Sequence, residues 1–558
     1  MANCFIGNYG PDADQLVCIN AVEGTYNVVA GPGSGKTATL LQRWVNMLMN
    51  GIDPKNTLNV TFTHEAAEEM VKRLGFADTA SIFRTFHSYA LEIVRKERAC
   101  LPFKTTDDVL PFSGEDYQLL FELVKTYRAG VKNFRTLKDH IVEWKCADVS
   151  PEQAIDETLG LERYYGMAYR DYERKCREQG WLDFDSLMHE TVNLLERNDD
   201  VRQRWQREYI AVDECQDTNT LQFRFLQLLF KKNIFAVGDE NQLVYEWRNA
   251  QAGSLSNFEQ KFPGSQKLYL GRNYRSTGAI VKFLKRILPV DNGLGSRMMT
   301  TNPYGEDPVI TRYSDELEEA QQVIASIKEP GKTAILARTN RQLFEYQKIL
   351  TKQGQKYRIL GKKDYWEQNE VRALLRLAKD DLSLRPAHEV LARIIERERF
   401  FDKYRYAQNP MESSPVENLN DIVKMAATES RSKTGEVKWS GRGSISEFLA
   451  YLRRLTYGRK GKNGEAVTLA TVHQAKGHEW DYVYVIGVNQ KKMPHKDGEL
   501  PEERRIFYVA ASRPAKELHF SYTGQRSQFW PEEYPSRMYV GPAMGNTEET
   551  DGVSLHQQ

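Results

Sequence analysis

The sequence predicts an α/β protein with two parallel-sheet lobes, each interrupted by a mainly helical insert. Three short apolar runs end in polar turns and are separated by helical patterns: YNVVA (26–30), YIAVD (209–213) and IFAVGD (234–239). A second set follows later: TAILAR (333–338), VTLATV (467–472), YVYVIG (482–487) and LHFSY (518–522). Strands that alternate with helices favour a parallel sheet, whose functional residues gather at the carboxyl ends of the strands.

Length and composition indicate a globular chain of several domains. Its 558 residues exceed what one hydrophobic core ordinarily organises. Apolar residues make up 41% and charged residues 27%, which is typical of soluble globular proteins and excludes a disordered or fibrous chain. The net charge is only +1, so any nucleic-acid site has to come from local grooves of Lys and Arg.

Neither the cysteines nor the apolar segments point to a metal centre or a membrane. The six cysteines form no CxxC pair, so we expect reduced packing thiols in a cytosolic protein and no zinc site. The N-terminal stretch MANCFIGNYGPDADQ lacks the basic and apolar regions of a signal peptide. The longest strand-like apolar run, YVYVIGV (482–488), is too short to span a membrane.

Two inserts divide the predicted lobes. The first lobe is expected to comprise residues 1–97 and 186–277, separated by a helix-rich, aromatic insert over 98–185. The second lobe is expected over 278–375 and 463–530, with the second insert at 376–462. Within that insert, the polar stretch SRSKTGEVKWSGRGS (430–444) indicates a loop. The polar segment 531–558 is expected to be a flexible tail.

A phosphate-binding loop is predicted at AGPGSGKT (30–37), between the strand YNVVA and the helical run ATLLQRWVNML. Backbone N–H groups of such a loop wrap phosphate oxygens, assisted by the positive end of the helix; the loop residues are Gly31, Gly33, Ser34 and Gly35. Lys36 can reach the β- and γ-phosphates, and the Thr37 hydroxyl can bind Mg²⁺. Ala30 replaces the first glycine of the strict pattern, and the alternative reading is a Gly/Ser-rich turn with an incidental lysine.

Acidic residues follow the second apolar run, in YIAVDECQD (209–217). Asp213 at the end of the strand can hold the Mg²⁺ shell, and Glu214 can act as the general base on the attacking water. Solvated acidic turns are common, so this pair is weak by itself. Together with the phosphate loop, it predicts hydrolysis of a nucleoside triphosphate.

A series of ordered motifs resembles the UvrD/Rep/PcrA group of superfamily 1A DNA helicases. The motifs are AGPGSGKT, TFTHEAAEEM (61–70), TFHS (85–88), VDECQDTN (212–219), VGDENQLVYEWRNA (237–250), LGRNYRST (270–277), TVHQAKGHEWDYVYVIG (471–487) and EERRIFYVAASR (502–513). The resemblance covers about residues 10–525. It implies two RecA-like P-loop ATPase lobes, with ATP and Mg²⁺ as cofactors.

The resemblance also implies nucleotide-binding roles for individual residues. Gln15 is similar to the glutamine that reads the adenine edge, and Tyr274 to the aromatic residue that stacks on the adenine. Glu479 resembles the glutamate that contacts the ribose, and Gln242 the sensor of the γ-phosphate. Arg275 and Arg513 resemble arginines that reach the γ-phosphate from the two lobes. Such guanidinium groups neutralise the transferring phosphoryl group and raise the rate by about 10³–10⁵.

Single-strand binding combines a basic groove with aromatic platforms. The candidates at the motifs that line the DNA path in the resembled family are Phe62, Thr63, His87, Tyr245, Trp247, Arg248 and His473. Core packing is the alternative for Phe62, and a structural role is the alternative for His87. Trp247 lies between two charged residues, which favours exposure. Gln242 precedes Tyr245 and Trp247 closely, so this segment is predicted to couple the state of the nucleotide to the grip on DNA.

Several positions depart from the family pattern. Ala38 stands where an arginine usually helps to sandwich the adenine, so either base recognition is looser or Arg43 is the substitute. His64-Glu65 replaces Asn-Lys, Cys215 replaces Phe, and Glu246 replaces Gly before the tryptophan. The second insert is shorter than the corresponding insert of the resembled family, which regulates the enzyme and contacts duplex DNA. The resemblance therefore implies unwinding that is less autoinhibited or that needs a partner.

The predicted function is an ATP-dependent DNA helicase that translocates on single-stranded DNA and opens junctions with duplex. The direction, 3′→5′, is implied by the resemblance alone. A partner in replication, repair or recombination and a cytoplasmic location in a bacterial or phage-infected cell are expected, with no membrane association. The alternatives are a translocase that displaces proteins or remodels recombination intermediates without efficient unwinding, and a nucleotide-gated DNA-binding scaffold.

Overall fold

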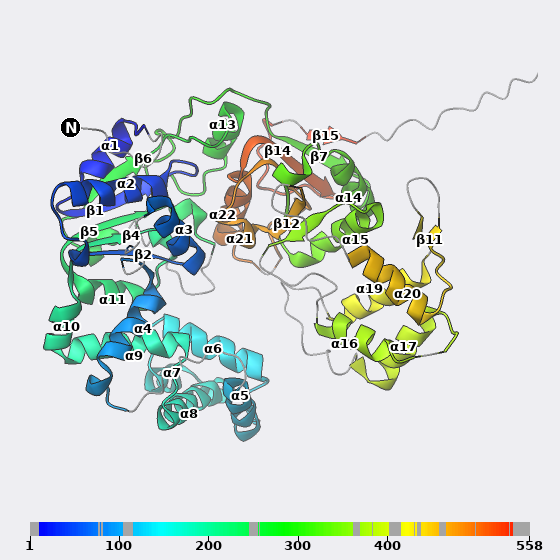
Figure 1. The fold of residues 1–558 in the computed structure, drawn as a ribbon, viewed down its shortest axis with the longest axis horizontal. Coiled ribbons are helices and arrows are strands. Elements are labelled where there is room, and N and C mark those ends of the chain that lie inside the picture. The colour runs from blue at the N-terminus through cyan, green and yellow to red at the C-terminus, as the bar shows by residue number, and fades with distance from the viewer. Residues whose placement is uncertain are drawn as a thin grey trace, which may run out of the picture. The chain divides into compact units, whose positions relative to one another are not determined.

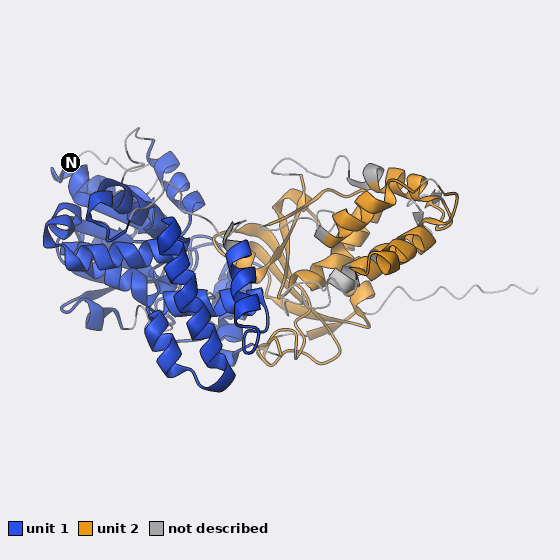
Figure 2. Ribbon diagram, turned by 90° about the horizontal axis from the view of Figure 1, so that it is seen from below, with its two compact units in different colours: residues 1–305, 498–512 blue, residues 306–497, 513–558 orange. Residues whose placement is uncertain are grey.

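The chain forms two compact units with an α/β sheet in each (Figures 1 and 2). The computed structural model describes residues 10–75, 79, 82–103, 115–244, 255, 257–360, 369–381, 383–400, 415–428, 430–431, 437–456, 465–496, 498–534 and 536–539. Unit 1 comprises Met1–Gly305 and Gly498–Ser512, and unit 2 comprises Glu306–Asp497 and Arg513–Gln558. No helix within the described ranges is long and apolar enough to cross a membrane. The four-part division proposed from the sequence remains a prediction.

Unit 1 is built on a six-stranded parallel sheet with the order β3-β2-β4-β5-β1-β6. Its strands are β1 (Thr25–Ala30), β2 (Thr57–Thr61), β3 (Phe83–Thr85), β4 (Arg207–Val212), β5 (Phe230–Gly238) and β6 (Gln266–Leu270). Val29 pairs with Gly238, and Val212 with Ala236, so β1, β5 and β4 end at the same edge. The turns predicted to carry the chemistry therefore meet there.

Helices cover both faces of this sheet, and successive strand residues point to opposite faces. Ile234 and Ala236 pack in the core under α4, α9 and α11, whereas Phe235 and Val237 pack under α1, α2 and α3. The helices are α1 (Ala13–Asn20), α2 (Lys36–Met49), α3 (His64–Leu74), α4 (Phe86–Lys96), α9 (Phe184–Arg197), α10 (Asp199–Trp205), α11 (Thr220–Leu229), α12 (Phe258–Lys261), α13 (Gly278–Arg286) and α22 (Leu500–Ala511). Burial on both faces explains why the strands are continuous apolar runs in the sequence.

A helical subdomain with its own core interrupts unit 1 between α4 and α9. It contains α5 (Glu115–Thr126), α6 (Phe134–Cys146), α7 (Pro151–Glu157) and α8 (Arg163–Gln179). Leu120, Leu137, Ile141 and Tyr172 lie at the centre of this core, which is separate from the two cores of the sheet. These helices occupy the range expected for the first insert.

Unit 2 has a seven-stranded parallel sheet with the order β15-β7-β14-β13-β8-β12-β9. Its strands are β7 (Val309–Tyr313), β8 (Thr333–Ala337), β9 (Tyr357–Ile359), β12 (Val467–Thr471), β13 (Trp480–Val485), β14 (Pro514–Thr523) and β15 (Ser536–Met538). Strand β15 lies inside the segment expected to be a flexible tail and pairs with β7. Two parallel sheets with helical inserts confirm the predicted fold class.

The remaining helices of unit 2 divide between the sheet and a second helical group. Helices α14 (Glu316–Ala325), α15 (Leu343–Gln353) and α21 (Val472–Ala475) contact the sheet or each other, and α16 (Asn369–Ala378), α17 (Ala387–Arg397), α19 (Pro415–Ala427) and α20 (Ile445–Thr456) form the group. The short hairpin of β10 (Ser430–Arg431) and β11 (Val437–Trp439) corrects the loop predicted over 430–444. Trp439 is buried and donates to the Ala426 carbonyl, so packing in this core overrides the polar local sequence.

Candidate functional site

The loop between β1 and α2 has the backbone that a phosphate site requires. Gly33 and Gly35 have φ of 67° and 77°, which side chains other than glycine rarely adopt. A Cβ on Gly33 would also lie 2.8 Å from the Arg275 Cβ. Gly35 is the N-cap of α2, and no side chain caps this helix. The first N–H groups of a 14-residue helix therefore face the loop without a side-chain acceptor, which fits an anion.

Oxygen ligands suited to Mg²⁺ meet beside this loop. The Thr37 hydroxyl donates to Asp213 Oδ2 at 3.2 Å, joining the start of α2 to the end of β4. Burial and the neighbouring Glu214 raise the pKa of Asp213 to about 7, and Lys36 opposes that rise. A hydroxyl and a buried carboxylate are hard oxygen donors, so these residues fit a Mg²⁺ ion that would carry the nucleotide phosphates.

Glu214 adopts a backbone conformation unusual for its residue type. Its φ is +51°, in the left-handed region, and its N–H donates to Asp213 Oδ1 at 3.0 Å. Non-glycine residues in this region carry strain of about 1–3 kcal/mol and are held there by surrounding structure. The 3-10 helix η5 (Cys215–Asp217) follows directly, so the turn fixes the direction of the Glu214 side chain.

A chain of hydrogen bonds connects Glu214 to Gln242, and we call it the 214–242 relay. Gln216 Nε2 donates to Glu214 Oε2 at 2.5 Å, and Gln216 Oε1 accepts from the Asp239 N–H at 3.0 Å. Gln242 Nε2, in the 3-10 helix η6 (Glu240–Gln242), donates to Asp239 Oδ2 at 2.7 Å. A Cβ on Gly238 would lie 2.3 Å from Gln216 Oε1, so a glycine is needed for this close approach. Gln216, Asp239 and Gln242 are buried.

Sequence reasoning did not single out Gln216. Its only signal was its place inside VDECQD, together with the glycine that precedes Asp239. Sequence reasoning also gave no role to Arg505 of α22, which is buried and donates to the Leu243 carbonyl at 2.9 Å. Both residues link segments that are distant in the sequence.

The two predicted adenine contacts lie together near the phosphate loop. Gln15 is buried and donates from Nε2 to the Ser34 carbonyl at 3.0 Å. Tyr274 is 42% exposed; its N–H donates to the Gly33 carbonyl at 2.8 Å and its hydroxyl to Asp12. The Tyr274 side chain is therefore partly exposed beside the phosphate loop, while the Gln15 amide is engaged by the loop.

Arg43 does not substitute for the arginine that the phosphate loop lacks. Its guanidinium is buried, donates to the carbonyls of Ala21 and Val22 at 2.9 and 3.0 Å, and lies over the Phe235 ring at 4.5 Å. These contacts hold α2 against the loop after α1. The hypothesis of substitution is therefore wrong, and looser recognition of the base remains.

The predicted arginines and the ribose-binding glutamate belong to different units. In unit 1, Arg275 donates to the carbonyl of Ser512, which caps α22, at 3.0 Å. In unit 2, Arg513 is buried, and its guanidinium donates to the His478 carbonyl at 3.4 Å. Glu479 is exposed directly before β13. The two guanidinium groups are thus held by carbonyl oxygens in their own units.

The DNA-binding candidates of unit 1 combine packing with exposure. Phe62 is half-buried against the core and lies edge-on to Phe86, with ring centroids 6.4 Å apart. Thr63 is exposed and caps α3 by accepting from the Ala66 N–H. The half-buried His87 ring lies 5.6 Å from the ring of Phe184, which is 44% exposed. An aromatic edge is therefore present where β2 and β3 end.

The remaining DNA-binding candidates are less directly visible. His473 of α21 is half-buried, and burial together with Arg338 and Lys476 lowers its pKa to about 3, so the ring is neutral at pH 7. A neutral ring stacks or accepts a hydrogen bond and supplies no charge. Tyr245, Trp247 and Arg248 lie outside the described residues, so their roles remain predictions.

Comparisons with known proteins give one consistent result. The model of the UvrD/REP helicase N-terminal domain matches residues 12–263, and that of the UvrD-like helicase C-terminal domain matches residues 268–401 and 389–525. A probable DNA helicase II homolog from Rickettsia felis is 27% identical over 96% of this chain and 95% of its own. The ATP-dependent DNA helicase Rep of Salmonella typhimurium is 27% identical (92% and 91% covered), and PcrA of Staphylococcus aureus 26% (93% and 84%).

Proposed function

We infer that this chain, which belongs to the UvrD/REP helicase family, is an ATP-dependent DNA helicase. Relatives named as ATP-dependent DNA helicases align along nearly its whole length. The observation that carries the assignment is the contact between Thr37 of the phosphate loop and Asp213, continued by the 214–242 relay. We propose that the enzyme moves 3′→5′ on single-stranded DNA and opens single-strand/duplex junctions.

Each side chain of the nucleotide site has a proposed part in hydrolysis. Lys36 and the N-terminus of α2 would bind the phosphates, and Thr37 and Asp213 would hold Mg²⁺, which neutralises phosphate charge when bound. Glu214 would accept the proton of the attacking water. Arg275 and Arg513 would lie against the γ-phosphate when the site is loaded and neutralise the charge that develops on it.

We propose that the 214–242 relay couples hydrolysis to DNA. Three hydrogen bonds join the base Glu214 to the sensor Gln242 through Gln216 and Asp239. The segment that contains Gln242 continues within a few residues to the predicted DNA platform. A movement of that platform on DNA would therefore reposition the base, and loss of the γ-phosphate would in turn change the grip on the strand.

A second candidate function is translocation without efficient unwinding. The short second insert favours it, because this insert is the part predicted to contact duplex. Strand displacement on a 3′-tailed duplex decides between the two functions. Separately, unwinding that survives deletion of residues 376–462 unchanged excludes a clamp role for the insert. We also propose that the protein acts in the cytoplasm of a bacterial or phage-infected cell, because single-stranded DNA and its junctions with duplex occur there. A partner protein in replication, repair or recombination is proposed as well, because these processes generate such DNA.

ATPase activity measured with single-stranded DNA, duplex DNA and RNA at one fixed salt concentration tests the proposal, since nucleic-acid affinity depends steeply on salt. We expect stimulation by single-stranded DNA and its abolition in Lys36→Ala. Turnover retained in Lys36→Ala would refute the assignment of the phosphate loop. Strand displacement on 3′-tailed and 5′-tailed duplexes then tests direction, and preference for the 5′ tail would contradict the proposed polarity.

A further inference from the structure

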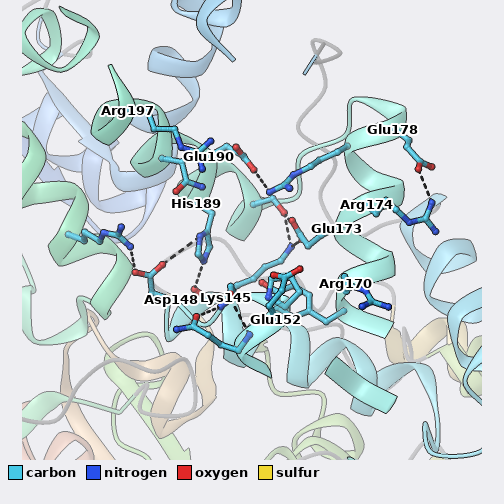
Figure 3. A pocket seen from close by; sticks show the side chains of 18 residues that line it. Lys145, Asp148, Glu152, Arg170, Glu173, Arg174, Glu178, His189, Glu190 and Arg197 are labelled. Carbon is cyan, nitrogen blue, oxygen red and sulfur yellow. Dashed lines mark hydrogen bonds and ion pairs between the residues drawn. The ribbon is translucent and has the colours of Figure 1, made fainter. Parts of the chain in front are cut away.

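A cavity of about 860 Å³ lies in unit 1 between α8, α9 and the turn that joins α6 to α7 (Figure 3). It stands at the seam between the core of the helical subdomain and the core of the sheet. None of the residues that line it belongs to the predicted nucleotide or DNA sites. Its volume falls within the range of ligand pockets, about 300–1,000 Å³.

Polar groups fixed in position form the floor of this cavity. Lys145 is 1% exposed; its ammonium lies 2.6 Å from Glu173 and 2.7 Å from Asp183, and it donates to the Ser186 hydroxyl. The two carboxylates hold the pKa of Lys145 well above its usual value despite burial. On the neighbouring wall, Arg177 pairs with Glu190 at 2.8 Å. A ligand therefore meets oxygen acceptors that are already oriented.

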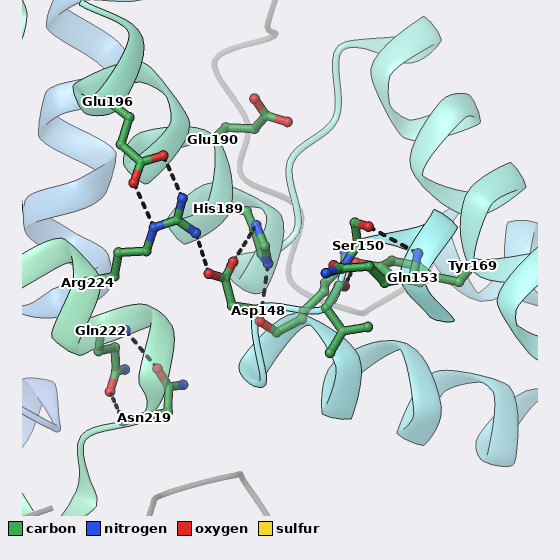
Figure 4. Close-up of polar contacts among 12 residues, drawn as sticks. Asp148, Ser150, Gln153, Tyr169, His189, Glu190, Glu196, Asn219, Gln222 and Arg224 are labelled. Carbon is green, nitrogen blue, oxygen red and sulfur yellow. Dashed lines mark hydrogen bonds and ion pairs between the residues drawn. The ribbon is translucent and has the colours of Figure 1, made fainter. Parts of the chain in front are cut away.

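A second set of contacts stiffens the side of the cavity nearest the sheet (Figure 4). Asp148 pairs with Arg224, which also forms a bidentate contact with Glu196. His189 lies between the Asp148 carboxylate, 3.6 Å away, and the Lys145 carbonyl, 3.2 Å away. This network joins α9, α11 and the α6–α7 turn, so the wall is preformed.

Two guanidinium groups at the cavity have no carboxylate partner within the described ranges. Arg170 projects from α8 and Arg197 from α9, on opposite walls (Figure 3). The other lining arginines are already paired; Arg174, for example, is paired with Glu178 at 2.8 Å. Positive charge is therefore available at two separated points, above a floor of acceptors.

This arrangement selects among anionic ligands. A DNA backbone offers only acceptors, so it cannot pair with the carboxylate oxygens of Glu152, Glu173 and Glu190 in the lining. A peptide offers N–H donors for those acceptors and, where it is acidic, carboxylates for the two guanidinium groups. We propose that the cavity binds an acidic peptide segment of a partner protein, with its carboxylates on Arg170 and Arg197. This docking site is separate from the ATP and DNA sites.

Fluorescence anisotropy of the full chain tests this docking site. The probe is a fluorescein-labelled six-residue peptide of alternating aspartate and glycine, titrated at low and moderate salt. The variants are Arg170→Glu and Arg197→Glu. The matched control is Arg163→Glu, which makes the same charge change at an exposed position on α8 that does not line the cavity. We expect each cavity variant to weaken binding by about tenfold or more and the control by less than about twofold.

Stimulation of the ATPase by single-stranded DNA should be unchanged in all three variants, which shows that they fold and that the nucleotide site is intact. If Arg163→Glu weakens peptide binding as much as the two cavity variants do, the attraction is non-specific and the proposal is overturned. Absence of peptide binding by the unmodified chain would overturn it as well. If a duplex oligonucleotide, rather than the peptide, depends on Arg170 and Arg197, the cavity contacts DNA and the assignment to a peptide is wrong.

Discussion

Replacing Gln216 by leucine tests the relay at its centre. Leucine fills a similar volume but can neither donate to Glu214 nor accept from the Asp239 N–H. In this variant the half-exposed Glu214 carboxylate can accept a hydrogen bond from water instead. The Asp239 N–H, however, is buried and loses its acceptor, which should lower the free energy of unfolding by about 1–3 kcal/mol. General-base catalysis contributes about 10²–10⁴-fold, so release of Glu214 from its orienting bond should lower kcat by about 10–100-fold.

The assay is steady-state ATP hydrolysis with and without single-stranded DNA. We expect the KM for ATP to change by less than about threefold, because phosphate binding does not involve Gln216, and the stimulation by DNA to fall together with kcat. The control is Gln222→Leu, which removes another buried glutamine that only caps α11 through the Asn219 N–H. A Gln216→Leu enzyme with normal kcat and normal stimulation would refute the relay. A reduced kcat with undiminished stimulation would reduce Gln216 to a structural role.

Three further outcomes follow from the contacts. The pKa of His473 is about 3 in the folded protein and about 6.5 in the unfolded chain, so its contribution to stability is complete above pH 6.5 and is lost as the pH falls toward 3. Between pH 7 and pH 4.5, the urea midpoint of His473→Gln should therefore fall less than that of the unmodified protein. An identical fall in the two proteins would contradict this. Lys145→Met should lower the free energy of unfolding by about 3–5 kcal/mol, because it leaves the buried carboxylates of Glu173 and Asp183 without their cation. Adding Asp183→Asn should restore part of that free energy, as measured by urea unfolding. Trp247→Ala should weaken single-stranded DNA binding by about 1–3 kcal/mol while ATP binding is unchanged; equal loss of both would indicate a core tryptophan.

Local sequence patterns were sufficient to predict the central strands and the phosphate loop. Strands buried on both faces read as continuous apolar runs, and β1, β4, β5, β8, β12, β13 and β14 all coincide with predicted runs. The glycines of AGPGSGKT, followed by Lys36 and a helical run, were almost sufficient to predict the conformation of the phosphate loop. Shorter or half-exposed strands such as β3, β6 and β9 lack such a signature and owe their conformation to pairing with neighbours.

Features that depend on tertiary contacts could not be predicted in this way. Gln216 meets Asp239 across two turns that are 23 residues apart in the sequence. Arg43 had the charge of an adenine clamp, but its helix points it at carbonyls of the turn after α1. The proposed peptide cavity depends on Arg170 and Arg197 lining one cavity from two different helices, and the spacing of residues in the sequence does not predict this.

The order of strands in unit 1 has a consequence for the time at which the protein can assemble. Among the described residues, strand β1 pairs with β5 and β6 alone, and Thr25 of β1 pairs with Ile234, about 200 residues later in the chain. At a synthesis rate of about 5–20 residues per second, the strand that leads into the phosphate loop stays without neighbours for about 10–40 s. During that interval the apolar strand β1 has no strand to pair with. The helical subdomain is complete earlier in the chain, so it can fold on the ribosome first. Slower translation between residues 30 and 230 should therefore lengthen the period in which the nascent chain depends on chaperones.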